Sequence, residues 1–80
     1  KAEGVLAGVP DIFLAAPVPP RSGLYIEMKR RKGGRATPAQ KAMMATLESS
    51  GYAVAVCYGW RQAAEAVEVY LAGHWEPCDA

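Results

Sequence analysis

The chain has 80 residues, of which 51% are hydrophobic and 21% charged, and its formal net charge is +1. This composition predicts one small soluble globular domain over residues 1–80, because no apolar run approaches the roughly 18 residues that a membrane-spanning helix requires. No secretory signal is recognisable and the two cysteines form no CxxC pair, which argues against a zinc site and favours a reducing, cytoplasmic compartment.

Residues 11–15 predict a first short strand, which the proline-containing stretch 17–20 ends in an extended, turn-like segment. The strand begins at the Asp of a Gly-Val-Pro-Asp sequence, residues 8–11. Pro-Asp commonly opens a turn, so Asp11 has an ordinary structural interpretation. A carboxylate is also a hard oxygen ligand, so Asp11 is a candidate for metal binding beside a second acid.

Residues 24–30 predict a second strand with the sequence Leu-Tyr-Ile-Glu-Met-Lys at its start. Successive side chains of a strand point to opposite faces, so Glu27 and Lys29 share one face and Ile26 and Met28 the other. If the two strands converge, Asp11 and Glu27 suit Mg²⁺ or Mn²⁺, and an ammonium beside them can hold or deprotonate a water. The alternative is an ion-paired or solvated strand face.

Positive charge is concentrated around and after this strand. Seven of the nine Lys and Arg residues lie between Arg21 and Lys41, where Glu27 is the only acid, whereas five acids and one base lie from Glu48 onward. Such a basic stretch is either a solvated surface or the contact region for an anionic partner, of which a polyphosphate backbone is the natural candidate. The candidate DNA-binding residues are Arg30, Arg31, Lys32, Arg35 and Lys41.

Residues 37–50 predict a helix that begins with its own capping signals. Thr37 is placed to cap the first turn, Pro38 suits the first helical position, and Gln40 completes a capping box. Gln40 therefore has a capping interpretation as well as a possible role at the site, and we expect its side chain to serve one of these at a time. Gly51 suits the end of the helix, and the methionine pair on it is expected in the core.

The last two elements complete an α/β pattern. Residues 52–58 form a continuous apolar run, which predicts a buried central strand that is parallel to its neighbour after the helical crossover. Residues 60–71 repeat apolar side chains at helical spacing with Glu65 and Glu68 outside, and Gly73 ends this second helix. The predicted order is strand, strand, helix, strand, helix.

Taken together in order and spacing, these motifs resemble the VRR-NUC (virus-type replication-repair nuclease) branch of the PD-(D/E)XK nuclease superfamily. The resemblance covers nearly the whole chain and is carried by Gly-Val-Pro-Asp at 8–11, Tyr-Ile-Glu-Met-Lys at 25–29, Gly34, Thr-Pro-Ala-Gln at 37–40, and the segments 47–51 and 53–56. It implies a restriction-endonuclease-like α/β core, a small mixed sheet flanked by helices.

The resemblance also implies roles for individual residues. Asp11, Glu27 and the carbonyl of Met28 would bind Mg²⁺ or Mn²⁺, Lys29 would position or activate the attacking water, and Gln40 would support the site. The implied activity is a metal-dependent DNA endonuclease, selective for branched structures such as Holliday junctions or flaps, of a phage type and homodimeric. No organic cofactor and no membrane partner are implied.

One departure from the family keeps two other classes of function open. Family members usually carry a further acid on a helix upstream of the Gly-Val-Pro-Asp segment, and only ten residues precede Asp11 here. We therefore expect either a longer protein or a domain that has lost its first helix. The alternatives are a non-catalytic DNA-binding module, and a protein-interaction domain whose acidic helix 60–71 and basic loop contact different subunits.

Overall fold

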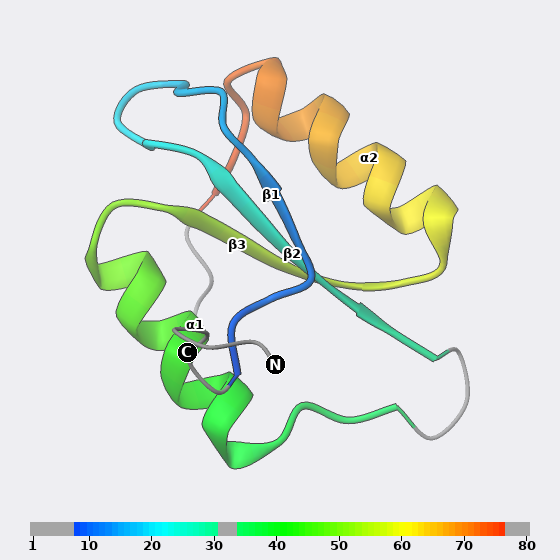
Figure 1. Cartoon of the computed structure of the whole chain (residues 1–80). Coiled ribbons are helices and arrows are strands. Elements are labelled where there is room, and N and C mark those ends of the chain that lie inside the picture. The colour runs from blue at the N-terminus through cyan, green and yellow to red at the C-terminus, as the bar shows by residue number, and fades with distance from the viewer. Residues whose placement is uncertain (1–7, 31–33, 77–80) are drawn as a thin grey trace.

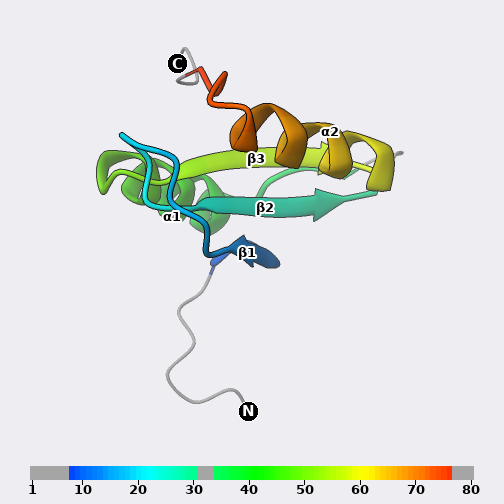
Figure 2. The ribbon, with the colours of Figure 1, turned by 90° about the horizontal axis from the view of Figure 1, so that it is seen from above.

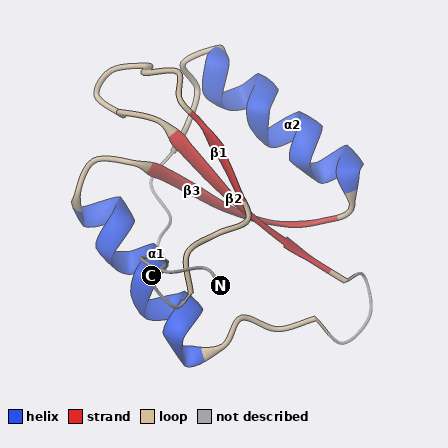
Figure 3. Cartoon of the chain, in the orientation of Figure 1, coloured by secondary structure: helices blue, strands red, loops and turns tan. Residues whose placement is uncertain are grey.

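The computed structural model describes residues 8–30 and 34–76. Within them the chain forms a mixed α/β fold with two helices and a three-stranded sheet (Figures 1 and 3). The elements, in chain order, are β1 (Ile12–Leu14), β2 (Leu24–Lys29), α1 (Pro38–Ser49), β3 (Ala53–Tyr58) and α2 (Trp60–Leu71). The predicted order of elements is confirmed, with shifts of one residue at ends of the strands and of α1.

The strands lie side by side in the order β1-β2-β3. β1 runs antiparallel to β2, with Phe13 opposite Tyr25, and β2 runs parallel to β3, with Glu27 opposite Val56. The parallel pair follows from α1, which carries the chain back along the sheet between β2 and β3, as a parallel connection requires. The predicted crossover is therefore confirmed.

The two helices lie on opposite sides of the sheet (Figures 1 and 2). The core lies between the sheet and α2, and its buried side chains are Leu24, Ile26, Ala53, Cys57, Ala63 and Tyr70. Because the strand period is two, alternate residues of β2 and β3 enter this core. The same alternation directs the residues between them to the opposite face.

β3 differs from its predicted place at the centre of the sheet. It lies at one end of the strand order in the described residues, and only Ala53 and Cys57 in it are buried, while Val56 is 36% exposed. The apolar run is continuous because each face of β3 has a helix beside it, α2 on one side and α1 on the other. An apolar run therefore indicated contact on two faces, which does not require a strand on both edges.

α1 begins as predicted and packs less deeply than predicted. Thr37 is its N-cap, with the Thr37 hydroxyl accepting from the Gln40 backbone N–H and the Gln40 side chain accepting from the Thr37 N–H. At its other end Ser50 is the C-cap, and Gly51 follows with a φ of +98°. None of its residues is fully buried, so the methionine pair is half-buried and not part of the core.

No helix in the described part of the chain is both long enough and apolar enough to cross a membrane.

Candidate active site

The face of β2 that points away from the core carries Tyr25, Glu27 and Lys29. Leu24 and Ile26 on the opposite face are buried in the core under α2. The sharing of one face by Glu27 and Lys29, predicted from the strand period, is confirmed. Glu27 is only 4% exposed, although it belongs to this outer face.

Glu27, Lys29 and Gln40 form one hydrogen-bonded network. The Gln40 Nε2 donates to Glu27 Oε2 at 2.8 Å, and the Lys29 Nζ donates to Gln40 Oε1 at 2.6 Å. The Lys29 Nζ also lies 3.4 Å from Glu27 Oε2, and both side chains are almost fully buried. Each of the three side chains therefore restricts the orientation of the other two.

Gln40 performs its capping and site roles at the same time, which corrects the expectation that it would serve one at a time. Its Oε1 accepts from both the Thr37 N–H, at 2.9 Å, and the Lys29 ammonium. Its Nε2 remains free to donate to Glu27. A carboxamide has an acceptor with two lone pairs and a separate donor, so a single rotamer satisfies all three partners.

The second carboxylate oxygen of Glu27 is buried and has no hydrogen-bond partner among the described residues. A buried, unpartnered carboxylate oxygen is unfavourable, and each such atom in a native protein calls for a ligand, a water or an ion. Hard oxygen ligands are those that Mg²⁺ and Mn²⁺ prefer. The Glu27 carboxylate therefore fits a divalent cation.

Asp11 is held beside Glu27 through the backbone of β2. Its Oδ2 accepts from the Met28 N–H at 2.9 Å, just before Ile12, the first paired residue of β1. The side chain is exposed to solvent. This hydrogen bond brings Asp11 to the backbone of β2 one residue from Glu27, and the binding of one metal by the two carboxylates stays a prediction.

Gly8 positions the segment that carries Asp11, a role that sequence reasoning missed. Its φ is +86°, and a Cβ built on it would lie 2.5 Å from the backbone oxygen of Ala39. The segment 8–11 thus crosses the first turn of α1 at a distance that only glycine permits. The signal in the sequence was the glycine three residues before Asp11.

The described residues contain no cluster of three or more His, Cys, Asp or Glu side chains placed to hold a metal. Two carboxylates are nevertheless a usual protein contribution to a Mg²⁺ site, in which substrate phosphate and water complete the coordination. Cys57 is a buried free thiol, and desolvation by burial raises its pKa. His74 is exposed near the end of the described chain.

Two of the predicted DNA-binding residues line a groove beside the network. Arg35 and Lys41 line an open depression of about 600 Å³ together with Val56, Tyr58 and other residues of β3, α1 and the segment before α1. Val56 and Tyr58 are the register partners of Glu27 and Lys29, so the groove adjoins the network. Arg30 is exposed at the end of β2, and Arg31 and Lys32 lie outside the described residues.

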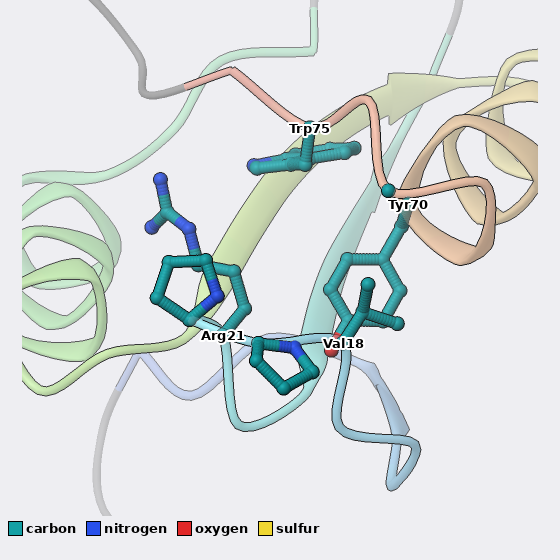
Figure 4. A pocket seen from close by; sticks show the side chains of 7 residues that line it. Val18, Arg21, Tyr70 and Trp75 are labelled. Atoms are coloured by element: carbon teal, nitrogen blue, oxygen red, sulfur yellow. The ribbon is translucent and has the colours of Figure 1, made fainter.

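A separate cavity lies away from this site. It encloses about 190 Å³ and is lined by Val18, Arg21, Tyr70, Trp75 and three further residues (Figure 4). These residues come from the segment before β2 and from the C-terminal part of α2 and the residues after it. No carboxylate lines the cavity.

Comparison with known proteins assigns the family. The sequence profile of the VRR-NUC domain matches residues 1–61. The chain belongs to the VRR-NUC domain family. A solved structure described as a VRR_NUC domain protein superposes on this VRR-NUC domain with a TM-score of 0.82 and 33% sequence identity, over 88% of this chain. No curated protein matches the chain.

The family and fold predicted from the motifs are thereby confirmed, and the family is one of nuclease-type domains. The VRR-NUC domain described here spans 58% of the length of the solved relative.

Proposed function

We propose that this VRR-NUC domain is a metal-dependent DNA endonuclease. The observation that carries the proposal is the hydrogen-bonded network of Glu27, Lys29 and Gln40, in which one oxygen of the buried Glu27 has no partner in the described structure. A buried carboxylate, a buried ammonium and a nearby cationic groove together suit hydrolysis of a phosphodiester.

The residues that would hold Mg²⁺ or Mn²⁺ are Asp11, Glu27 and the carbonyl of Met28. When bound, such an ion supplies an activated water and neutralises charge that develops on the phosphate. The Lys29 Nζ, fixed by Gln40 and Glu27, would hold that water or stabilise charge at the attacking oxygen. Gln40 keeps both charged groups in one rotamer, so its role is to position them.

The basic residues would contact phosphates and not base edges. Arg35 and Lys41 flank the groove next to the network, and Arg30, Arg31 and Lys32 would extend the positive surface. Phosphate contacts give affinity that falls with salt and carry no sequence information. The proposal therefore includes selectivity for the shape of branched DNA, such as a Holliday junction or a flap. It also includes a cytoplasmic location and a phage-type homodimer that makes paired cuts.

The test is cleavage of labelled junction, flap and linear duplex DNA in Mg²⁺, Mn²⁺ or EDTA. We expect metal-dependent cutting by the wild-type protein and by Glu65→Gln, a change at an exposed acid on α2, and none by Glu27→Gln. A thermal melt supplies a second readout. Mn²⁺ should raise the Tm of the wild-type protein and of Glu65→Gln, and leave that of Glu27→Gln unchanged.

A non-catalytic DNA-binding module is the second candidate, because the described residues contain no cluster of three or more His, Cys, Asp or Glu side chains that could hold a metal. It predicts salt-sensitive DNA binding with no cutting in any metal. Equal cutting by Glu27→Gln and the wild-type protein would show that the network is not the site.

A further inference from the structure

Three aromatic rings gather on the sheet face that carries Glu27. Phe13 of β1 stacks on Tyr25 of β2, with ring centroids 4.4 Å apart and planes at 26°. Tyr52, just before β3, meets both rings edge-on, at 5.9 Å from Phe13 and 5.3 Å from Tyr25. Phe13, Tyr25 and Tyr52 together form an aromatic platform. Each ring is held by two others, so the platform is preorganised.

The platform presents Phe13 to solvent. Its side chain is 46% exposed, and Tyr25 covers one face of the ring, so the exposed part is the outer face and edge. Gly23 makes room for the ring, because a Cβ at this buried position would lie 2.6 Å from the Phe13 Cε1. The chain thus places a large, rigid apolar ring at the surface of the sheet face that carries the proposed site.

The position of the platform relative to Glu27 suits one nucleotide of an unstacked strand. Phe13 lies opposite Tyr25, two residues from Glu27, so Phe13 and Glu27 are diagonal neighbours on one sheet face, about 7–8 Å apart. In duplex DNA the bases follow one another at about 3.4 Å, and each base face is covered by its neighbours. A base can stack on the platform beside a phosphate at Glu27 only if it has left the duplex stack.

We propose that the aromatic platform binds an unpaired nucleobase adjacent to the phosphate that is cut. The inference rests on the proposed nuclease function and names its substrate class, DNA with unpaired nucleotides at the point of cleavage. Stacking on aromatic rings tolerates any base, which agrees with recognition by shape. From Glu27 the strand would continue into the groove of Arg35 and Lys41, which adjoins Glu27 and Lys29 through their register partners Val56 and Tyr58.

The test combines abasic substrates with substitutions at Phe13. After the cleavage point of a flap or junction substrate is mapped with metal, binding is measured in EDTA with an abasic site at each successive position around it. We expect the wild-type protein to lose about tenfold in affinity at one position beside the cut. Phe13→Leu should bind the intact substrate about tenfold more weakly than the wild-type protein does. Removal of the same base should not weaken its binding further.

Two variants and one fluorescence measurement keep the test decisive. Phe13→Trp retains an aromatic ring and should keep the position-specific loss. Trp60→Leu, at a residue 70% exposed at the start of α2, should behave as wild type. If Phe13→Leu does not fold, 2-aminopurine at the sensitive position of the wild-type complex should still be quenched by stacking.

The outcomes separate the two proposals. Suppose that the protein cuts DNA with metal but no abasic position weakens its binding, or that the same position weakens binding equally in Phe13→Leu. Either result overturns the proposed role of the platform and leaves the nuclease function standing. A protein that neither binds nor cuts DNA overturns both. If Phe13→Leu instead turns a wild-type dimer into a monomer in light scattering without changing the abasic scan, the platform is an interface between copies.

Discussion

Replacing Gln40 by alanine tests whether one side chain couples the helix cap to the site. The matched control is Gln62→Ala, because Gln62 also lies in the first turn of a helix and accepts one backbone N–H, that of Tyr58, at 2.8 Å. Both changes exchange glutamine for alanine near a helix start. Their differences in intrinsic helix propensity therefore cancel.

The two variants differ in the number of hydrogen bonds removed. Gln62→Ala removes one exposed, neutral bond, for a loss of about 1 kcal/mol. Gln40→Ala removes three, one to the Thr37 N–H and two to the charged Lys29 and Glu27. The neutral bond to Thr37 contributes about 1 kcal/mol, and each bond to a charged side chain about 1.5 kcal/mol. A tighter Lys29–Glu27 ion pair in the variant would restore about 1 kcal/mol. The free energy of unfolding should therefore fall by about 3 kcal/mol.

The measurement is the Tm of each variant by circular dichroism or calorimetry. A difference of about 2 kcal/mol between the variants corresponds to about 10 °C for a domain of this size. In the DNA assay, Gln40→Ala should also cut more slowly, whereas Gln62→Ala should cut as the wild type does. Equal melting temperatures and equal cleavage for the two variants would show that Gln40 is only a helix cap.

The remaining predictions concern the backbone, the core and the thiol. Gly8→Ala should lower the free energy of unfolding by about 2–4 kcal/mol, because alanine is strained at a positive φ and its Cβ would clash with the backbone of Ala39. Gly73→Ala, at a φ of +80° with open space around it, should lower it by only about 1 kcal/mol. Equal urea midpoints for the two variants would refute this. Tyr70→Phe should lose about 1 kcal/mol, since the hydroxyl of this fully buried residue donates to a backbone carbonyl at 2.6 Å; an unchanged Tm would contradict it. In a Cys78→Ser background, Cys57 should react with a thiol reagent at neutral pH only as the protein unfolds. Burial raises the pKa of the Cys57 thiol, so the protonated thiol is favoured in the fold. The stability that this preference contributes is lost as the pH rises from the ordinary thiol pKa through the raised one; fast labelling of native protein would refute it.

Local sequence signals predicted most of the fold because each element carries its own period and caps. Thr37, Pro38 and Gln40 specified the start of α1, and the alternation along β2 placed Glu27 and Lys29 on one face. The edge position of β3 was not predictable in this way. A strand covered by helices on both faces has the same apolar pattern whether or not another strand pairs with its outer edge.

The parts of the site that sequence reasoning missed depend on contacts between distant segments. The requirement for glycine at position 8 arises from the backbone of Ala39, which lies thirty-one positions along the chain. The triple use of Gln40 depends on the distance between β2 and α1, which no local pattern encodes. The roles of Asp11, Glu27, Lys29 and Gln40 in catalysis remain predictions for the assays described above.

The alternation along β2 has a consequence for how this domain tolerates change. Leu24 and Ile26 support the core, whereas Tyr25, Glu27 and Lys29 form the outer face. Point substitutions at Leu24 and Ile26 therefore act mainly on stability, whereas those at Glu27 and Lys29 act on the chemistry and also on the network that Gln40 completes. Insertion or deletion of a single residue within β2 would affect both faces at once. It would turn Glu27 and Lys29 into the core and the core residues outward. We expect length to be the most restricted property of this six-residue segment.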